Sequence, residues 1–159
     1  MTDNTIAGRP ISGTISHYGS TLREQQPLEE LISALDAVFA FPEVGSIQWT
    51  QYTPYFNDGD ACIFSTNDPR IRVRGVGSEE GDNEDGYLTE WDIVYGNDPK
   101  YSKTPKYPQV SDELLTALQK LESALESGAH DVKLRQYFGD PAEVTATREG
   151  FDVEFYDHE

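Results

Sequence analysis

The sequence predicts an α+β domain in which two main amphipathic helices pack on one face of a mostly antiparallel sheet of about five to six short strands. Two stretches carry leucine and other apolar residues at the three- and four-residue spacing of a helix. Several shorter stretches alternate apolar with polar residues and end at Gly, Pro, Asn or Asp, which is typical of half-buried strands. Elements in this order favour helices layered on a sheet.

The chain length predicts a single domain. A chain of 159 residues is long enough to bury a core of its own. Residues 1–25 are loosely patterned, with isolated isoleucines among Gly, Ser, Thr and Asn. They are expected to form either a flexible tail or an extended arm laid on the body or on a partner. The folded domain is then expected to cover residues 26–159.

The helices are predicted from apolar stripes with start and stop signals. Pro27 suits a helix start because its missing N–H costs nothing in the first turn. The first stripe consists of Leu28, Leu31, Ile32, Leu35, Val38 and Phe39. Ser111 is a good N-cap for the second helix, and Gly128 is a natural stop. The second stripe consists of Leu114, Leu115, Leu118, Leu121 and Leu125. A shorter helix is predicted over residues 130–138.

The central strands are predicted in the most aromatic part of the chain, residues 49–64. A strand through Ile47 and Trp49 is expected to turn at residues 57–60, where Asn, Asp and Gly tolerate a positive φ. The return strand is expected to run from Cys62 to Phe64.

Three further strand regions follow from two-residue alternation. Residues 70–74 alternate arginine with Ile71 and Val73, which predicts a strand with all three arginines on one face. Residues 87–95 predict another strand, and residues 144–156 predict a hairpin that turns near Gly150.

Charge and cysteine content exclude several classes of function. The net charge is −17, which argues against nucleic acid or an anionic membrane as a direct partner and favours a basic protein surface. No run approaches the roughly 18 apolar residues of a membrane span. Cys62 is the only cysteine, so no intramolecular disulfide and no four-cysteine zinc site can form. One thiol and a polar start predict a cytoplasmic protein.

No set of residues has the spacing of a known catalytic or metal site, so no catalytic residue, metal or cofactor is assigned. The three histidines lie far apart in the sequence. The acidic loop 81–86 has Gly81 where a calcium loop needs its first carboxylate. Residues 90 and 92, and residues 152 and 154, are acidic pairs expected to share a strand face. They could serve a two-metal nuclease or simply form a polar outward face.

Two surfaces are candidates for binding another molecule. The first is the aromatic turn, because Tyr and Trp anchor interfaces well; it consists of Trp49, Gln51, Tyr52, Tyr55, Asn57 and Asp58. The alternative is a structural turn whose aromatic residues cover the core. The second surface is acidic and consists of Glu79, Glu80, Asp82, Glu84 and Asp85. The basic residues of 70–74 and 100–106 either track a nucleic-acid strand or pair with the protein's own acids.

Two stretches carry a resemblance to a known family. Residues 49–60, WTQYTPYFNDGD, with Cys62 and Phe64, and residues 138–158, from Phe138-Gly139-Asp140 to His158, resemble small proteins encoded by tailed bacteriophages. The resemblance covers roughly residues 27–159, and Ala61 stands where the family pattern has proline. It implies a phage protein acting in the bacterial cytoplasm or the virion. It supplies no catalytic residues.

These features together predict a non-enzymatic phage accessory protein that binds, and thereby inhibits, a host protein with a basic surface. Such a protein would act in host takeover or against host defence in the bacterial cytoplasm. Two alternatives stay open, a virion or assembly component and a small-molecule or nucleotide-binding protein. The sequence also leaves a homo-oligomer open.

Overall fold

The computed structural model describes residues 5–13, 25–53, 64–76, 86–101 and 103–156. The strands are β1 (Thr5–Ile6), β2 (Arg9–Gly13), β3 (Val44–Tyr52), β4 (Ser65–Thr66), β5 (Arg70–Val73), β6 (Tyr87–Thr89), β7 (Ala142–Ala146) and β8 (Phe151–Glu154). The helices are α1 (Leu28–Phe39), α2 (Glu90–Asn97), α3 (Asp112–Glu126) and α4 (Asp131–Phe138). The predicted α+β class is confirmed, but these residues form more helices and strands than the sequence predicted.

One eight-stranded sheet organises the domain. Its order is β1-β2-β8-β7-β3-β5-β6, and β4 pairs with β3 outside that path. Every pairing is antiparallel except that of β2 with β8. The long strand β3 lies at the centre, between β7 and β5. Because side chains alternate along a strand, β3 divides the molecule into an apolar face and a polar face.

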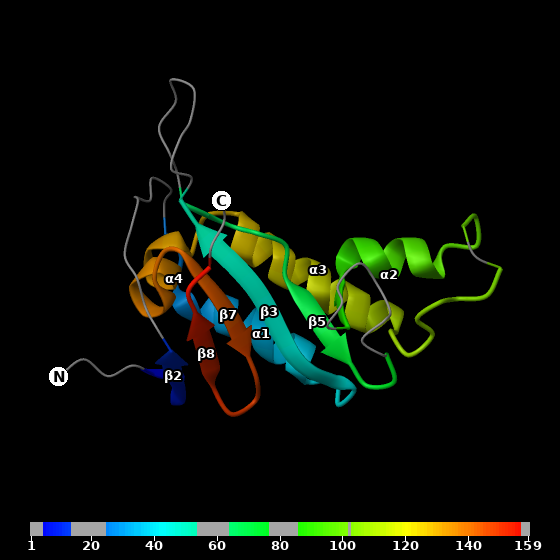
Figure 1. Cartoon of the computed structure of the whole chain (residues 1–159), viewed down its shortest axis with the longest axis horizontal. Coiled ribbons are helices and arrows are strands. Elements are labelled where there is room, and N and C mark those ends of the chain that lie inside the picture. The colour runs from blue at the N-terminus through cyan, green and yellow to red at the C-terminus, as the bar shows by residue number, and fades with distance from the viewer. Residues whose placement is uncertain (1–4, 14–24, 54–63, 77–85, 102, 157–159) are drawn as a thin grey trace, which may run out of the picture.

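The apolar face of the sheet packs against α1 and α3, which cross behind it in Figure 1. Ile47, Trp49 and Ile71 are fully buried on this face. The predicted stripes of both helices supply the facing side chains, including Leu35 and Leu118. The predicted cap is also present, because the Ser111 hydroxyl accepts a hydrogen bond from the Leu114 backbone N–H. The sequence therefore predicted this layer and its ends correctly.

The segment predicted as a tail or an arm contributes to the sheet where the structure describes it. Residues 5–13 form β1 and β2, and β2 pairs in parallel with β8, with Ile11 opposite Phe151. Gly13 ends β2 against β8. A Cβ on Gly13 would lie 1.7 Å from the Val153 carbonyl oxygen, so only glycine fits this close approach.

The prediction of a strand over residues 87–95 is wrong beyond Thr89. Only Tyr87–Thr89 forms a strand, and the chain then turns into α2 at Glu90. The Thr89 hydroxyl accepts a hydrogen bond from the Asp92 backbone N–H, and the Asp92 carboxylate accepts one from the Thr89 N–H. This reciprocal capping box stabilises a helix start, and it overrides the alternation that predicted a strand.

The predicted C-terminal hairpin and the helix before it are confirmed as β7, β8 and α4. Arg148, in the hairpin turn, donates hydrogen bonds to the backbone carbonyls of Phe39, Phe41 and Val44. The carbonyl of Phe39 is at the C-terminal end of α1, where it has no partner within the helix, whereas Phe41 lies just after the helix and Val44 begins β3. The turn thus ties the hairpin to α1.

Candidate functional site

The predicted aromatic turn begins with residues that are engaged inside the domain. Trp49 is 1% exposed, and its indole N–H donates a hydrogen bond of 3.0 Å to the Gln51 side-chain oxygen. The Gln51 amide nitrogen donates to the carbonyl oxygens of Leu134 and Gly139 at 3.0 and 2.8 Å. Trp49 and Gln51 therefore hold β3 to α4, as the alternative of a structural turn expects.

The other predicted binding residues are less fully described. Tyr52 is half-buried and its ring lies 5.8 Å from that of Tyr156. Tyr55, Asn57 and Asp58 lie outside the described residues, as does Cys62. The predicted acidic surface, Glu79, Glu80, Asp82, Glu84 and Asp85, also lies outside them. The contact roles of these residues stay predictions.

The arginines of β5 lie on the polar face of the sheet. The guanidinium groups of Arg70 and Arg72 lie 5.6 and 5.4 Å from the centre of the Tyr87 ring. Arg70 also donates to the Gln48 side-chain oxygen and lies 3.9 Å from a Glu143 carboxylate oxygen. Arg70 is thus close to one of the protein's own acids, as one of the two sequence alternatives expects.

The structure places the two acidic pairs singled out in the sequence on different kinds of element. Residues 90 and 92 lie in the first turn of α2 instead of on a strand, and Asp92 is used by the capping box. Asp152 and Glu154 do share one exposed face of β8, in keeping with the polar outward face considered above.

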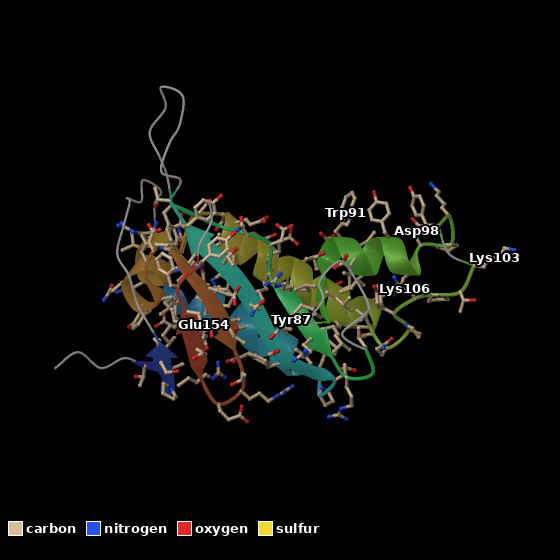
Figure 2. The ribbon with its side chains drawn as sticks, in the orientation of Figure 1. Tyr87, Trp91, Asp98, Lys103, Lys106 and Glu154 are labelled. Carbon is tan, nitrogen blue, oxygen red and sulfur yellow. The ribbon has the colours of Figure 1, made fainter. Side chains whose placement is uncertain are left out.

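Sequence analysis missed a stack of three exposed aromatic side chains on α2 and the segment after it. The ring centres of Trp91 and Tyr95 are 4.2 Å apart, and those of Tyr95 and Tyr101 are 5.0 Å apart. The three residues are 61%, 37% and 66% exposed, respectively. Figure 2 shows the Trp91 side chain on the outer side of α2, directed away from the sheet. We call these three residues the aromatic stack.

The chain after α2 is fastened to the end of the helix at Lys106 and Tyr107. The Asn97 side chain donates a hydrogen bond to the Tyr107 carbonyl and accepts one from the Tyr107 N–H, at 3.0 and 2.8 Å. The Lys106 N–H donates to the Gly96 carbonyl at 2.8 Å. Gly96 permits this approach, because a Cβ there would lie 2.6 Å from the Tyr107 ring. Closer to the aromatic stack, the Tyr101 N–H donates a hydrogen bond of 3.0 Å to the Asp98 carbonyl, just after α2.

A second unpredicted feature is an acidic pocket of about 520 Å³ between the sheet and the N-terminal end of α2. Asp68, in the connection from β4 to β5, and Glu126, on α3, both line it. Glu122 lies one helical turn before Glu126. One carboxylate oxygen from each of these three acids lies within 4.8 Å of the others. We call Asp68, Glu122 and Glu126 the carboxylate cluster.

The close approach of these carboxylates changes their proton affinity. A hydrogen bond with Asp68, together with partial burial and nearby acids, raises the pKa of Glu126 to about 8. Burial, with the charges of Asp68 and Glu90, raises the pKa of Glu122. In both residues burial and the neighbouring negative charges disfavour the ionised carboxylate. Oxygen atoms in this arrangement suit a hard cation such as Ca²⁺ or Mg²⁺.

Only part of this geometry leaves a signal in the sequence. The Thr89-x-x-Asp92 capping box predicts a helix start, and Trp91 and Tyr95 are then four residues apart on one face. Glu122 and Glu126 share a face of the second predicted helix for the same reason. Nothing in the sequence predicts that Asp68 joins them, because that contact depends on how β4 lies against α3.

The fold is an α+β domain with a polar sheet face, an exposed aromatic stack and an acidic pocket. No family model, curated protein or solved structure matches the chain. Among the described residues, no helix has both the length and the apolar character needed to cross a membrane.

Proposed function

We propose that this chain is a non-enzymatic binding protein that engages another protein through the aromatic stack. The observation that carries the proposal is the exposure of Trp91, Tyr95 and Tyr101 side by side on one surface. Large aromatic side chains are the commonest anchors of protein interfaces, since they bury much surface with few rotatable bonds. Three such rings side by side form an apolar patch of the kind that marks an interface, whereas a single exposed apolar side chain does not indicate one.

The rigidity of the stack supports this proposal. The capping box fixes the start of α2, and the Tyr101 N–H bonds to the Asp98 carbonyl just after the end of that helix. A contact surface that is already ordered loses less conformational entropy when it binds. Aromatic residues that covered the core would instead be buried, as Trp49 is.

The net charge indicates what kind of partner fits. With a charge of −17, the chain attracts a basic surface and repels nucleic acid and other polyanions. We therefore propose a partner that presents basic residues around an apolar hollow for the aromatic rings. The acidic segment Glu79, Glu80, Asp82, Glu84 and Asp85 precedes β6 and α2 in the chain and is proposed to contribute to this attraction.

We propose the biological setting from the sequence resemblance alone. A phage accessory protein of this kind would act in the host bacterial cytoplasm by blocking a basic host protein, in host takeover or anti-defence. If the chain is instead a virion or assembly component, it will be present in purified particles. If it binds a small molecule or nucleotide, that ligand will copurify with it.

Affinity capture with matched variants tests the proposed function. The tagged chain is incubated with bacterial lysate at about 50 mM and about 200 mM salt, because charge contacts weaken strongly over that range. Compared in parallel are the double variant Trp91→Ala/Tyr101→Ala and the control Phe155→Ala, which removes an exposed aromatic side chain elsewhere. The proposal predicts one partner that the control retains, the double variant loses, and higher salt releases.

Two results would contradict the proposal. Equal capture by the double variant and the wild type would show that the aromatic stack is not the contact surface. Recovery of only a second copy of the chain would make the stack a homo-oligomer interface, which sedimentation of the purified protein would verify.

A further inference from the structure

We infer that the acidic pocket binds one hard divalent cation, of the Ca²⁺ or Mg²⁺ class, through the carboxylate cluster of Asp68, Glu122 and Glu126. The site and the aromatic stack share no residue. The inference does not depend on the proposed protein contact. It also revises the expectation from the sequence that no metal is bound.

The spacing of the three carboxylates fits a single ion. One oxygen from each residue lies within 4.8 Å of the other two. Oxygen ligands bind Ca²⁺ at about 2.3–2.6 Å, so two ligands of one ion lie at most about 5 Å apart. The ligand set contains only carboxylate oxygens, which favour hard cations over zinc or copper.

The negative charges of the carboxylate cluster favour a bound cation. Glu122 and Glu126 are one turn apart on α3, where two like charges destabilise a helix. Asp68 approaches them from the connection between β4 and β5, and Glu90 lies close enough to raise the pKa of Glu122. Within the described ranges, no lysine or arginine forms a salt bridge with a member of the carboxylate cluster.

A buried hydroxyl group provides a second, independent indication of a ligand. Thr66 lines the same pocket and is 7% exposed, and within the part of the chain that the structure describes its Oγ1 atom has no hydrogen-bond partner. A buried hydroxyl is costly when it bonds to nothing. A bound cation, or a water molecule in its coordination shell, would satisfy this oxygen atom.

The pocket has room to complete the coordination. Its volume of about 520 Å³ exceeds that of an ion, so water molecules can supply the ligands that the protein does not. Asp92 and Glu143 line the same pocket and add negative charge. Arg70 also lines it, but its guanidinium group is held by Gln48 and lies 3.9 Å from Glu143.

Calorimetric titration of the full chain tests the inference. The protein is first freed of metal with a chelator and is then titrated separately with CaCl₂ and MgCl₂. The inference predicts saturable binding of one ion per chain to at least one of the two cations. Absence of saturable binding tighter than about 10⁻³ M for both would overturn it.

Three variants locate the site. Glu126→Gln removes one ligand charge, and Glu113→Gln makes the same change on an exposed residue near the other end of α3. We expect Glu126→Gln to weaken binding by about tenfold or more and Glu113→Gln to leave it unchanged. Thr66→Val, which keeps the side-chain shape but removes the hydroxyl, should weaken binding as well.

The variants also separate a true site from general attraction to an acidic surface. If Glu126→Gln and Glu113→Gln weaken binding equally, the ions respond only to overall charge, and the inference fails. We expect the Glu126→Gln variant to fold, because its side-chain amide can still donate a hydrogen bond to Asp68. Circular dichroism of the metal-free variant provides that check.

Discussion

The carboxylate of Asp140 accepts two hydrogen bonds from Thr53, one of 2.9 Å from the backbone N–H and one of 2.6 Å from the hydroxyl. Asp140 is fully buried, and its carboxylate also lies 3.4 Å from the Arg135 Nε atom. Residues 49–53 and residues 138–140, far apart in the sequence, therefore meet in space at this carboxylate. Their shared role is to fasten the end of β3 to the segment after α4.

Replacing Asp140 with alanine should destabilise the fold strongly. The Asp140→Ala variant leaves the Thr53 N–H and hydroxyl without acceptors in the interior, so we expect a loss of about 3 kcal/mol. Urea unfolding measures this loss. The control Glu154→Ala removes an exposed acid opposite Glu143 and should cost nothing, since like charges facing each other across strands repel. Similar stability of both variants would contradict the structural role of Asp140.

Residues 49–53 show what sequence patterns can predict and what they cannot. Alternation predicted the strand and the burial of Trp49, but it also offered Trp49 and Gln51 as contact residues. The Gln51 amide finds its partners in α4 and at Gly139, far along the chain, and the Trp49 indole N–H bonds to Gln51. A buried glutamine and an exposed one look the same in sequence, so only the tertiary structure separates the two interpretations.

The carboxylate cluster should make the stability of the metal-free protein fall as the pH rises. The pKa of Glu126 is about 8 in the folded chain against an ordinary value of 4.5, so the folded state binds more protons between these values. Its contribution to stability is therefore fully present below pH 4.5 and is lost as the pH rises through 8.

The Glu126→Gln variant isolates this effect. The difference in unfolding free energy between the variant and the wild type should move in favour of the variant as the pH rises from 4.5 to 8. Urea unfolding across that range, with a chelator present, provides the measurement. A difference that stays constant with pH would show that Glu126 titrates normally.

The titration of His130 should change the folding stability with pH in the opposite direction. Burial lowers the pKa of this side chain below 6.5, although the charge of Glu30 opposes the shift. The unfolded state then binds the proton more readily, so stability is fully present above pH 6.5 and falls as the pH drops below it. The NMR titration of the imidazole should show a pKa below 6.5, and His130→Gln should reduce the acid sensitivity. A pKa above 6.5 would contradict the burial of His130.

Gly13 should control whether residues 5–13 stay on the sheet. In Gly13→Ala the new Cβ would collide with the Val153 carbonyl, and the positive φ of 109° is also unfavourable for alanine. We expect β2 to separate from β8 at a cost of about 1–3 kcal/mol. Hydrogen exchange at Ile11 should then quicken, whereas the control Gly45→Ala, whose new Cβ would lie no closer than 3.9 Å to a neighbouring atom, should exchange nearly as the wild type. Unchanged exchange in Gly13→Ala would argue against the parallel pairing.

The two candidate sites differ in how much the sequence reveals. The alternation of residues 87–95 predicted a strand, which would have separated Trp91 from Tyr101. The capping box at Thr89 carried the correct signal, but it competed with a strong two-residue pattern. The carboxylate cluster combines α3 with a loop from the middle of the chain, and the unpartnered Thr66 hydroxyl is visible only after folding.

Site-specific photo-crosslinking in bacterial cells tests the proposed contact surface most directly. A photoreactive phenylalanine derivative is placed at position 91 or 101, and at position 155 as the exposed control. The account predicts that positions 91 and 101 both form an adduct with the same protein and that position 155 does not. The absence of any adduct at 91 and 101, or an equal adduct at 155, would contradict binding through the aromatic stack.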